Sequence, residues 1–249
     1  RPQRREVQTW FVLTLICIAV YLTWPELDLQ VARWFYTPGL GFDADQWPWV
    51  HPWHMSVPWV GRAMLLACVL LLAFGQRRLT PALRRKTMGL LVCLIVGLWL
   101  IMHLGFKDNW GRARPSQITE LGGTQTYTSP LVPSAACDTN CSFMSGHAGT
   151  GFVLIAVGAL AATRTRRRWI AIGWAAGLVL GFIRVAQGGH FLGDVLFGGN
   201  GADTYYLTGA GNSISDTGAD TGIDVVKSWT SVNSFNYFNT SQPYNIVSG

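Results

Sequence analysis

The sequence predicts an all-α fold: a polytopic helical bundle that spans a membrane and is followed by a small, polar, glycine-rich segment. Three observations support this prediction. Of the 249 residues, 49% are hydrophobic and 13% are charged, whereas a soluble domain carries about 25% charged residues. Five apolar stretches come close to the ~20 residues that a membrane helix needs. Basic residues gather in every second loop between these stretches.

The five apolar stretches are the predicted membrane spans. The first could instead be a signal peptide, but no small-residue cleavage pattern precedes Pro25, so a retained anchor is expected. The predicted spans are residues 9–24, 57–75, 88–106, 145–163 and 169–187.

The basic residues predict the orientation of these spans. They precede the first span and fill the loops between spans two and three and between spans four and five. Cytoplasmic loops carry an excess of Lys and Arg, so the N-terminus is expected in the cytoplasm. Loops 25–56 and 107–144, and everything after span five, then face outward. The net charge of +6 lies beside apolar spans instead of forming an exposed stripe, so no nucleic-acid partner is expected. The basic residues are Arg1, Arg4 and Arg5; Arg77, Arg78, Arg84, Arg85 and Lys86; and Arg164, Arg166, Arg167 and Arg168.

Three polar motifs fall on the predicted outer side. They are residues 107–115, 145–147 and 184–194. Lys107, Arg114 and Arg184 concentrate positive charge at the membrane edge, and guanidinium groups suit phosphate oxygens. Ser145, Gly146 and His147 open a predicted helix, whose N-terminus favours an anion. These groups predict a phosphate site.

Two histidines supply the chemistry of this predicted site. His190 and Asp194 are four residues apart and would share one face of a helix. The carboxylate would then take the proton of one imidazole nitrogen and leave the other free to attack. His147 would be the general acid for the leaving oxygen. Because no dense carboxylate cluster is available for Mg²⁺, phosphoryl transfer without a metal cofactor is expected.

The pattern K-x6-R-P, S-G-H and R-x5-H-x3-D resembles that of the type 2 phosphatidic acid phosphatase (PAP2) superfamily of lipid phosphatases. The resemblance covers roughly residues 8–199. It implies six membrane helices, an outer active site without metal, and a phosphohistidine on His190. By the same resemblance Asp194 supports His190, and His147 is the acid. It assigns phosphate binding to Lys107, Arg114, Ser145, Gly146 and Arg184. Met144 and Ile183 depart from the family pattern, where Pro and Ser are usual.

These expectations describe a lipid phosphatase in the bacterial inner membrane with its site on the outer face. The substrate would be a lipid phosphate or diphosphate, such as lipid A phosphate, undecaprenyl pyrophosphate, phosphatidylglycerophosphate or phosphatidate, and no residue chooses among them. Vanadium haloperoxidases share this type of pocket and form an alternative, against which the five predicted spans argue. Cys137 and Cys141 lie in a polar outer loop and could form a disulfide in an oxidising compartment.

The chain departs from the PAP2 pattern after Gly199. Residues 200–249 are polar and contain no stretch of spanning length, so the sixth helix is missing from the predicted fold. The run from Gly198 to Tyr206 matches the G-G-x-G-x-D-x-U-x nonapeptide and resembles the end of an RTX-repeat (calcium β-roll) protein. This resemblance implies Ca²⁺ at Asp203; a weakly ordered glycine-rich tail is the other interpretation.

The sequence therefore divides into residues 1–199 and 200–249, with a junction near Gly198 and Gly199. Without the sixth helix, the segment that carries His190 could be misplaced. The alternative function is thus a catalytically impaired chimera that acts as a membrane-anchored calcium-binding or surface module.

Overall fold

A computed structural model describes residues 2–75 and 79–198 of the chain. The predicted calcium site at Asp203, the RTX-like repeat and the polar segment 200–249 lie outside the described residues, as does Gly199 at the predicted junction.

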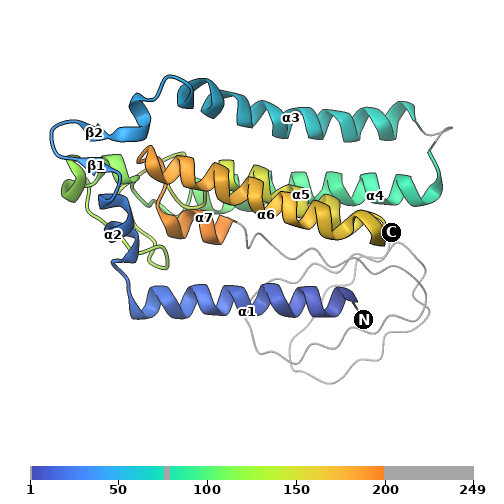
Figure 1. Cartoon of the computed structure of the whole chain (residues 1–249), viewed down its shortest axis with the longest axis horizontal. Coiled ribbons are helices and arrows are strands. Elements are labelled where there is room, and N and C mark those ends of the chain that lie inside the picture. Colours follow the sequence, from blue (N-terminus) through green and yellow to red (C-terminus); the bar gives the residue numbers. More distant parts are fainter. Residues whose placement is uncertain (1, 76–78, 199–249) are drawn as a thin grey trace. The chain divides into compact units, whose positions relative to one another are not determined.

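The described chain is an array of long apolar helices that run alongside one another (Figure 1). The predicted all-α membrane bundle is confirmed, and each predicted span coincides with a helix. These helices are α1 (Pro2–Thr23), α3 (Val50–Phe74), α4 (Pro81–Val92) continued by the π-helical η2 (Cys93–Lys107), α5 (Gly146–Leu160) and α6 (Thr163–Ala186).

The spanning lengths differ from those predicted. Three of the described helices are long and apolar enough to cross a membrane: α3, α4 with η2, and α6. A fourth span results if α1 is joined to α2 (Leu27–Arg33), which is bent from it by 84°. Helix α5 is shorter than the predicted span 145–163, because the backbone turns extended at Ala161 and α6 begins at Thr163.

Two predicted basic loops are also partly helical. Arg84, Arg85 and Lys86 lie in the first turns of α4, and the arginines from 164 to 168 lie in the first turns of α6. Each helix therefore extends beyond its apolar stretch with a charged end.

Short elements gather at one end of the long helices (Figure 1). Strands β1 (Tyr36–Thr37) and β2 (Gly41–Phe42) form an antiparallel pair with Tyr36 opposite Phe42. The other short elements are η1 (Asp43–Gln46), η3 (Pro115–Gln117), η4 (Thr119–Leu121) and α7 (Leu192–Gly198). The predicted outer loop 25–56 is thus largely structured, and α3 begins within it.

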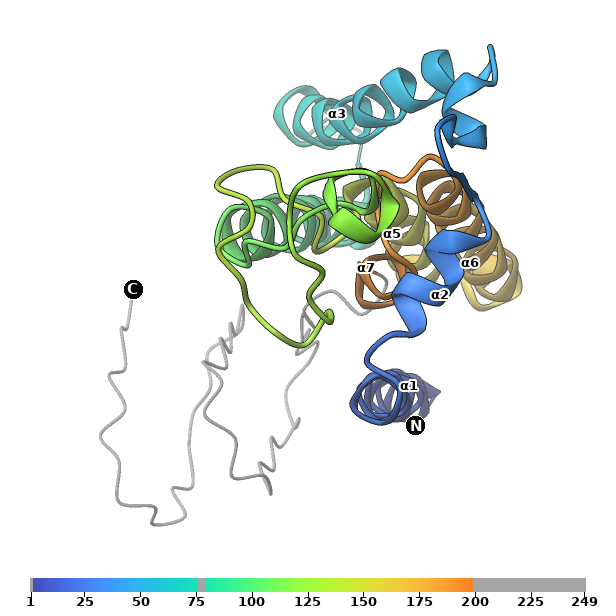
Figure 2. The same ribbon diagram turned by 90° about the vertical axis from the view of Figure 1, so that its left-hand side faces the viewer.

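Helices α5 and α6 pack most closely, and α1 and α3 lie on opposite sides of this pair (Figure 2). The close approach depends on glycine: a Cβ atom on Gly151 would lie 2.5 Å from the backbone nitrogen of Gly177. Small residues at helix interfaces allow such contact between apolar helices. This closely packed pair carries the start of α5 and the end of α6 to the same end of the bundle as the short elements.

Candidate active site

Charged and polar side chains are buried where the ends of four helical elements meet. Lys107 ends η2, Ser145 is the N-cap of α5, Arg184 lies in the last turn of α6 and Asp194 lies in the first turn of α7. With His190 they are all buried. Buried charge in an apolar bundle is costly and is retained mainly at functional sites. This group is the candidate active site.

Lys107 and Arg114 meet at one residue of the loop before α5. Lys107 Nζ donates to Asn140 Oδ1 at 3.3 Å and to the Cys141 carbonyl at 3.1 Å. Arg114 Nη2 donates to the Asn140 carbonyl at 2.7 Å. Asn140 has a positive φ of 49°, a conformation that asparagine tolerates better than most residues. The two predicted phosphate-binding cations are therefore held by the backbone and side chain of Asn140.

A disulfide between Cys137 and Cys141 closes the loop that contains Asn140. The Cys141 N–H donates to the Lys107 carbonyl at 2.9 Å, which joins this loop to the end of η2. The disulfide thus tethers the residue that holds both cations.

Arg184 enters the site from α6. Its Nη1 donates to Gln187 Oε1 at 2.7 Å, and a Cβ atom on Gly189 would lie 2.1 Å from Nη2. Only glycine lets the backbone pass this close to the guanidinium. The charges of Arg184 and Lys107 act electrostatically on both His147 and His190. Both imidazoles therefore lie in the field of the same cations.

His190 lies next to Asp194 but not on the same helix face, and a backbone carbonyl lies closer to it. His190 precedes α7, which begins at Leu192, so it does not share a helix face with Asp194. Its Nδ1 donates to the Ser142 carbonyl at 2.7 Å, whereas Asp194 Oδ2 is 3.7 Å away. A carbonyl oxygen only accepts, so Nδ1 carries the hydrogen and Nε2 keeps its lone pair. The backbone carbonyl of Ser142, not the carboxylate of Asp194, fixes the tautomer.

Burial and the nearby charges of Lys107 and Arg184 hold the pKa of His190 well below its usual value. The imidazole is therefore neutral at pH 7, which is the form that a nucleophile requires.

Asp194 lies beside the His190 imidazole and also organises the segment around it. Its carboxylate accepts hydrogen bonds from the Phe191 N–H at 2.8 Å, from Ser142 Oγ, and from Arg112 Nη1. Burial favours the neutral acid, but the charge of Arg112 and the neighbouring His190 and Ser142 side chains outweigh it and hold the pKa of Asp194 well below its usual range. Asp194 is thus an anion that fixes the loop around His190.

Arg112 and Asp28 are site residues that were not predicted from the sequence. Arg112 is fully buried, and its Nη2 lies 2.7 Å from Asp28 Oδ2. Its Nε donates to the Thr128 carbonyl at 2.8 Å. Asp28 also accepts the Gly193 N–H at 2.7 Å. Arg112 lies inside the first motif, where its charge could have been noticed, but Asp28 lies 84 positions from Arg112 and 165 from Gly193, so no motif connects it to the site.

The start of α5 has the geometry of a capped helix. Ser145 Oγ accepts the Ala148 N–H at 3.4 Å. A Cβ atom on Gly146 would lie 3.6 Å from Lys107 Cε, so the lysine passes beside this helix end. His147 Nε2 lies 3.0 Å from the His54 carbonyl of α3. The structure thus brings the second motif beside Lys107 and turns His147 toward α3.

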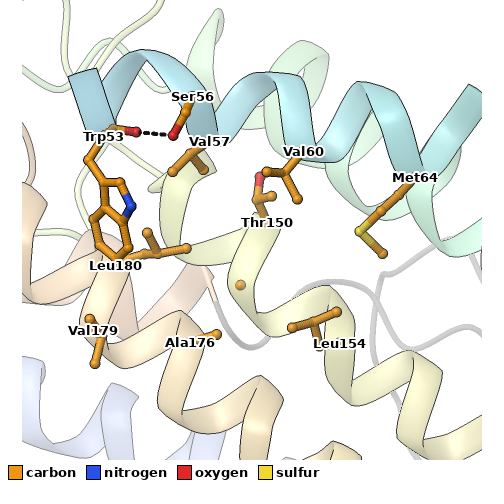
Figure 3. Close-up of a pocket in the computed structure, with 11 residues that line it drawn as sticks. Trp53, Ser56, Val57, Val60, Met64, Thr150, Leu154, Ala176, Val179 and Leu180 are labelled. Atoms are coloured by element: carbon orange, nitrogen blue, oxygen red, sulfur yellow. Dashed lines mark hydrogen bonds between the residues drawn. The ribbon is translucent and has the colours of Figure 1, made fainter. Parts of the chain in front are cut away.

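An apolar groove lies between α3, α5 and α6 (Figure 3). Its volume is about 260 Å³. On α5 it begins at Thr150 and Gly151, one turn beyond His147. It is lined by Trp53, Ser56, Val57, Val60, Met64, Thr150, Gly151, Leu154, Ala176, Val179 and Leu180. The groove leads from the edge of the candidate site along the apolar length of the helices.

Within residues 2–75 and 79–198, no group of three or more His, Cys, Asp or Glu side chains could hold a metal ion. The cations whose charges reach both His147 and His190 are Lys107 and Arg184, which are donors suited to a phosphate oxyanion.

Comparison with known proteins identifies relatives of this chain. The model of the PAP2 superfamily matches residues 86–200. A lipid A 4'-phosphatase of Francisella tularensis subsp. novicida (strain U112) is 34% identical over 185 residues, which are 72% of this chain and 82% of the relative. A lipid A 4'-phosphatase of Rhizobium etli is 25% identical over 211 residues, 76% of this chain and 79% of the relative. One of Rhizobium leguminosarum is 31% identical over 106 residues, 42% and 45% of the two chains. No solved structure is significantly similar to the chain.

Proposed function

Because this chain belongs to the PAP2 superfamily, we propose that it is a phosphatase that removes phosphate from a lipid through a phosphohistidine on His190. One observation carries the proposal: Nδ1 of His190 is bonded to the Ser142 carbonyl, which leaves Nε2 as a neutral nucleophile among buried cations. The named activity of the relatives supports the reaction class.

The first step transfers the phosphoryl group to His190. The Nε2 lone pair attacks phosphorus, and an N–P bond forms as the bond from phosphorus to the lipid oxygen breaks. His147 gives its proton to the departing oxygen, and the negative charge of the bound phosphate favours the imidazolium that this step requires, against the effect of burial. Lys107, Arg114 and Arg184 neutralise charge on the non-bridging oxygens, so the protein binds the transition state more strongly than the substrate.

The second step releases inorganic phosphate. Water attacks phosphorus while the N–P bond breaks, and neutral His147 takes the proton of that water. His190 Nε2 regains its lone pair, and His147 is an imidazolium again. Protons and charge balance over the two steps, and neither step requires a group other than these residues.

We further propose that the substrate is a lipid A 4'-phosphate or a similar phosphorylated glycolipid. The relatives' names support this choice. The groove between α3, α5 and α6 supports a lipid because it offers an apolar path beside His147. An acyl chain in that groove would leave its phosphate at the outer end of α5, where the cations lie.

We also propose that the protein lies in the bacterial inner membrane with its site on the outer face. The basic first turns of α4 and α6 lie at the end of the bundle away from the candidate site. Their positive charge favours a cytoplasmic position for that end, so the site faces outward. The disulfide beside the site favours an oxidising compartment.

The test measures phosphate released from lipid A, undecaprenyl pyrophosphate and phosphatidate by purified wild type, His190→Ala and His51→Ala, each with and without EDTA. His51 is an exposed histidine outside the site and serves as the control. We expect release by wild type and His51→Ala in EDTA, and a loss of at least about 10³-fold in His190→Ala. Full activity of His190→Ala would contradict the assignment of His190 as the nucleophile. If the wild type released phosphate from none of the lipids, the proposed phosphatase activity would be wrong, and a membrane anchor without activity would be favoured.

A further inference from the structure

Helix α3 contains a proline in its interior, at position 58. In an α-helix each N–H donates to the carbonyl four residues earlier. Proline has no N–H, so Pro58 cannot make this bond to the carbonyl of His54. The carbonyl of His54 therefore requires a donor other than the usual helical one.

His147 supplies a donor from another helix. Its Nε2 lies 3.0 Å from the His54 carbonyl, although the two residues are 93 positions apart. Their imidazole rings also contact each other, with centroids 4.6 Å apart and planes tilted by 33°. Because the carbonyl only accepts, Nε2 of His147 carries a hydrogen. The contact fixes the tautomer and the orientation of the ring.

The neighbouring carbonyl in α3 is used differently. Ser56 Oγ donates to the Trp53 carbonyl at 2.8 Å, and Figure 3 shows this bond within the helix. Of these two adjacent carbonyls, one is thus bonded by a side chain of α3 and the other by the imidazole from α5.

We propose that Pro58 is a positioning residue for the general acid: it opens the His54 carbonyl to His147 and leaves Nδ1 as the nitrogen that transfers the proton. The proposal rests on the proposed function, in which His147 protonates the leaving oxygen. A hydrogen bond from Nε2 to a carbonyl favours the imidazolium, whereas burial disfavours it most and the Arg184 and Lys107 charges disfavour it further.

The proton transfer follows from this tautomer. As the bond from phosphorus to the leaving oxygen breaks, the Nδ1 proton moves to that oxygen, and the electron pair of the N–H bond stays on Nδ1. The ring is then neutral and remains bonded to His54 through Nε2. In the second step Nδ1 takes the proton of the attacking water, so the ring need not turn between steps.

The test compares Pro58→Ala with Pro52→Ala. Both prolines lie in α3 and are exposed. Alanine at 58 provides an N–H that competes with His147 for the His54 carbonyl. Alanine at 52 lies in the first turn, where N–H groups have no partner within the helix. The two variants thus differ in whether the His54 carbonyl gains a helical donor.

Two substrates separate acid catalysis from a general structural effect. One is the lipid phosphate, whose alcohol leaves only with a proton; the other is p-nitrophenyl phosphate, whose phenolate leaves without one. For Pro58→Ala we expect kcat on the lipid to fall about 10–100-fold, with little change in KM and little change on p-nitrophenyl phosphate. Pro52→Ala should match the wild type on both.

A second measurement does not depend on activity. In protein labelled with ¹⁵N at histidine, assigned with His147→Gln, the ring nitrogens of His147 should report a protonated Nε2 in wild type and Pro52→Ala. In Pro58→Ala a mixture of tautomers is expected.

An unchanged tautomer in Pro58→Ala, or an equal loss of kcat on both substrates, would overturn the role of Pro58. An inactive wild type would overturn the proposed function alone, because the nitrogen resonances would still decide whether Pro58 fixes the ring.

Discussion

Asp28 Oδ1 accepts the backbone N–H of Gly193 at 2.7 Å and joins α2 to the first turn of α7 across 165 positions of sequence. The same carboxylate pairs with Arg112, which pairs in turn with Asp194. From the sequence, the segment that carries His190 is expected to depend on a sixth helix. In the structure, residues that precede this segment in the chain hold it.

Replacement of Asp28 by Asn should therefore impair catalysis without touching the phosphate. The amide would leave Arg112 with one buried carboxylate instead of two. We expect a loss of about 3 kcal/mol in stability and a fall in kcat of about 100-fold, because small displacements of a nucleophile are costly. Thermal unfolding and lipid A dephosphorylation measure the two effects.

Tyr21→Phe is the matched control for Asp28→Asn, because the Tyr21 hydroxyl donates to the same carboxylate at 2.5 Å. Its removal leaves the charge and the Gly193 bond in place, so a loss of about 1 kcal/mol and a nearly normal kcat are expected. Equal kcat in both variants would show that the position of His190 does not depend on Asp28.

Asn140→Gly should weaken substrate binding. Glycine keeps the positive φ and the carbonyl that Arg114 uses, but it removes the Oδ1 contact to Lys107. A hydrogen bond to a charged group is worth about 1.5–3 kcal/mol, and Lys107 keeps its bond to the Cys141 carbonyl, so we expect KM to rise about tenfold. Thr139→Gly alters the same disulfide-closed loop without removing Oδ1. A similar rise in KM for that variant would assign the effect to loop flexibility.

The tautomer of His190 predicts its titration. Because burial and two cations hold its pKa well below the usual value, the ¹⁵N resonances of its ring should keep the pattern of protonated Nδ1 and bare Nε2 as the pH falls below 6.5. Protonation is then favoured in the unfolded chain over the folded one, so stability is lost as the pH falls from about 7 to 5. His190→Gln should lose less stability over this range. A ring that titrates near 6.5 in the folded protein would contradict the prediction.

A bulky side chain in the groove should distinguish lipids from small phosphates. Val60 is 52% exposed and lines the groove on α3. Tryptophan there should raise KM for lipid A about tenfold, since the acyl chain loses apolar contact area, and should leave the hydrolysis of p-nitrophenyl phosphate unchanged. Val69→Trp, on the same helix outside the groove lining, should match the wild type. Equal KM values for the two variants would show that the acyl chain does not bind in the groove.

The predictions from sequence succeeded where the physical signal is local. Apolar length predicts a helix wherever it occurs, so all five stretches were found, but their ends were misjudged where charged residues extend α4 and α6. The three motifs were recognisable because each concentrates phosphate-binding residue types within a few positions. The shared helix face of His190 and Asp194 was wrong, since the helix begins at Leu192, and a backbone carbonyl from residue 142 lies closer to His190 than the carboxylate does.

The sequence by itself determined that the chain is a helical membrane bundle and where residue types suited to phosphate are concentrated, because hydropathy and motif spacing act over short stretches. Only the tertiary structure decided which atoms accept the hydrogen bonds of the His190 and His147 imidazole rings. Ser142 and His54 contact His190 and His147 through main-chain carbonyls, which every residue possesses, and their use depends on a fold that brings distant segments within 3 Å. Asp28 and Arg112 likewise become partners because burial away from water makes an unpaired charge too costly.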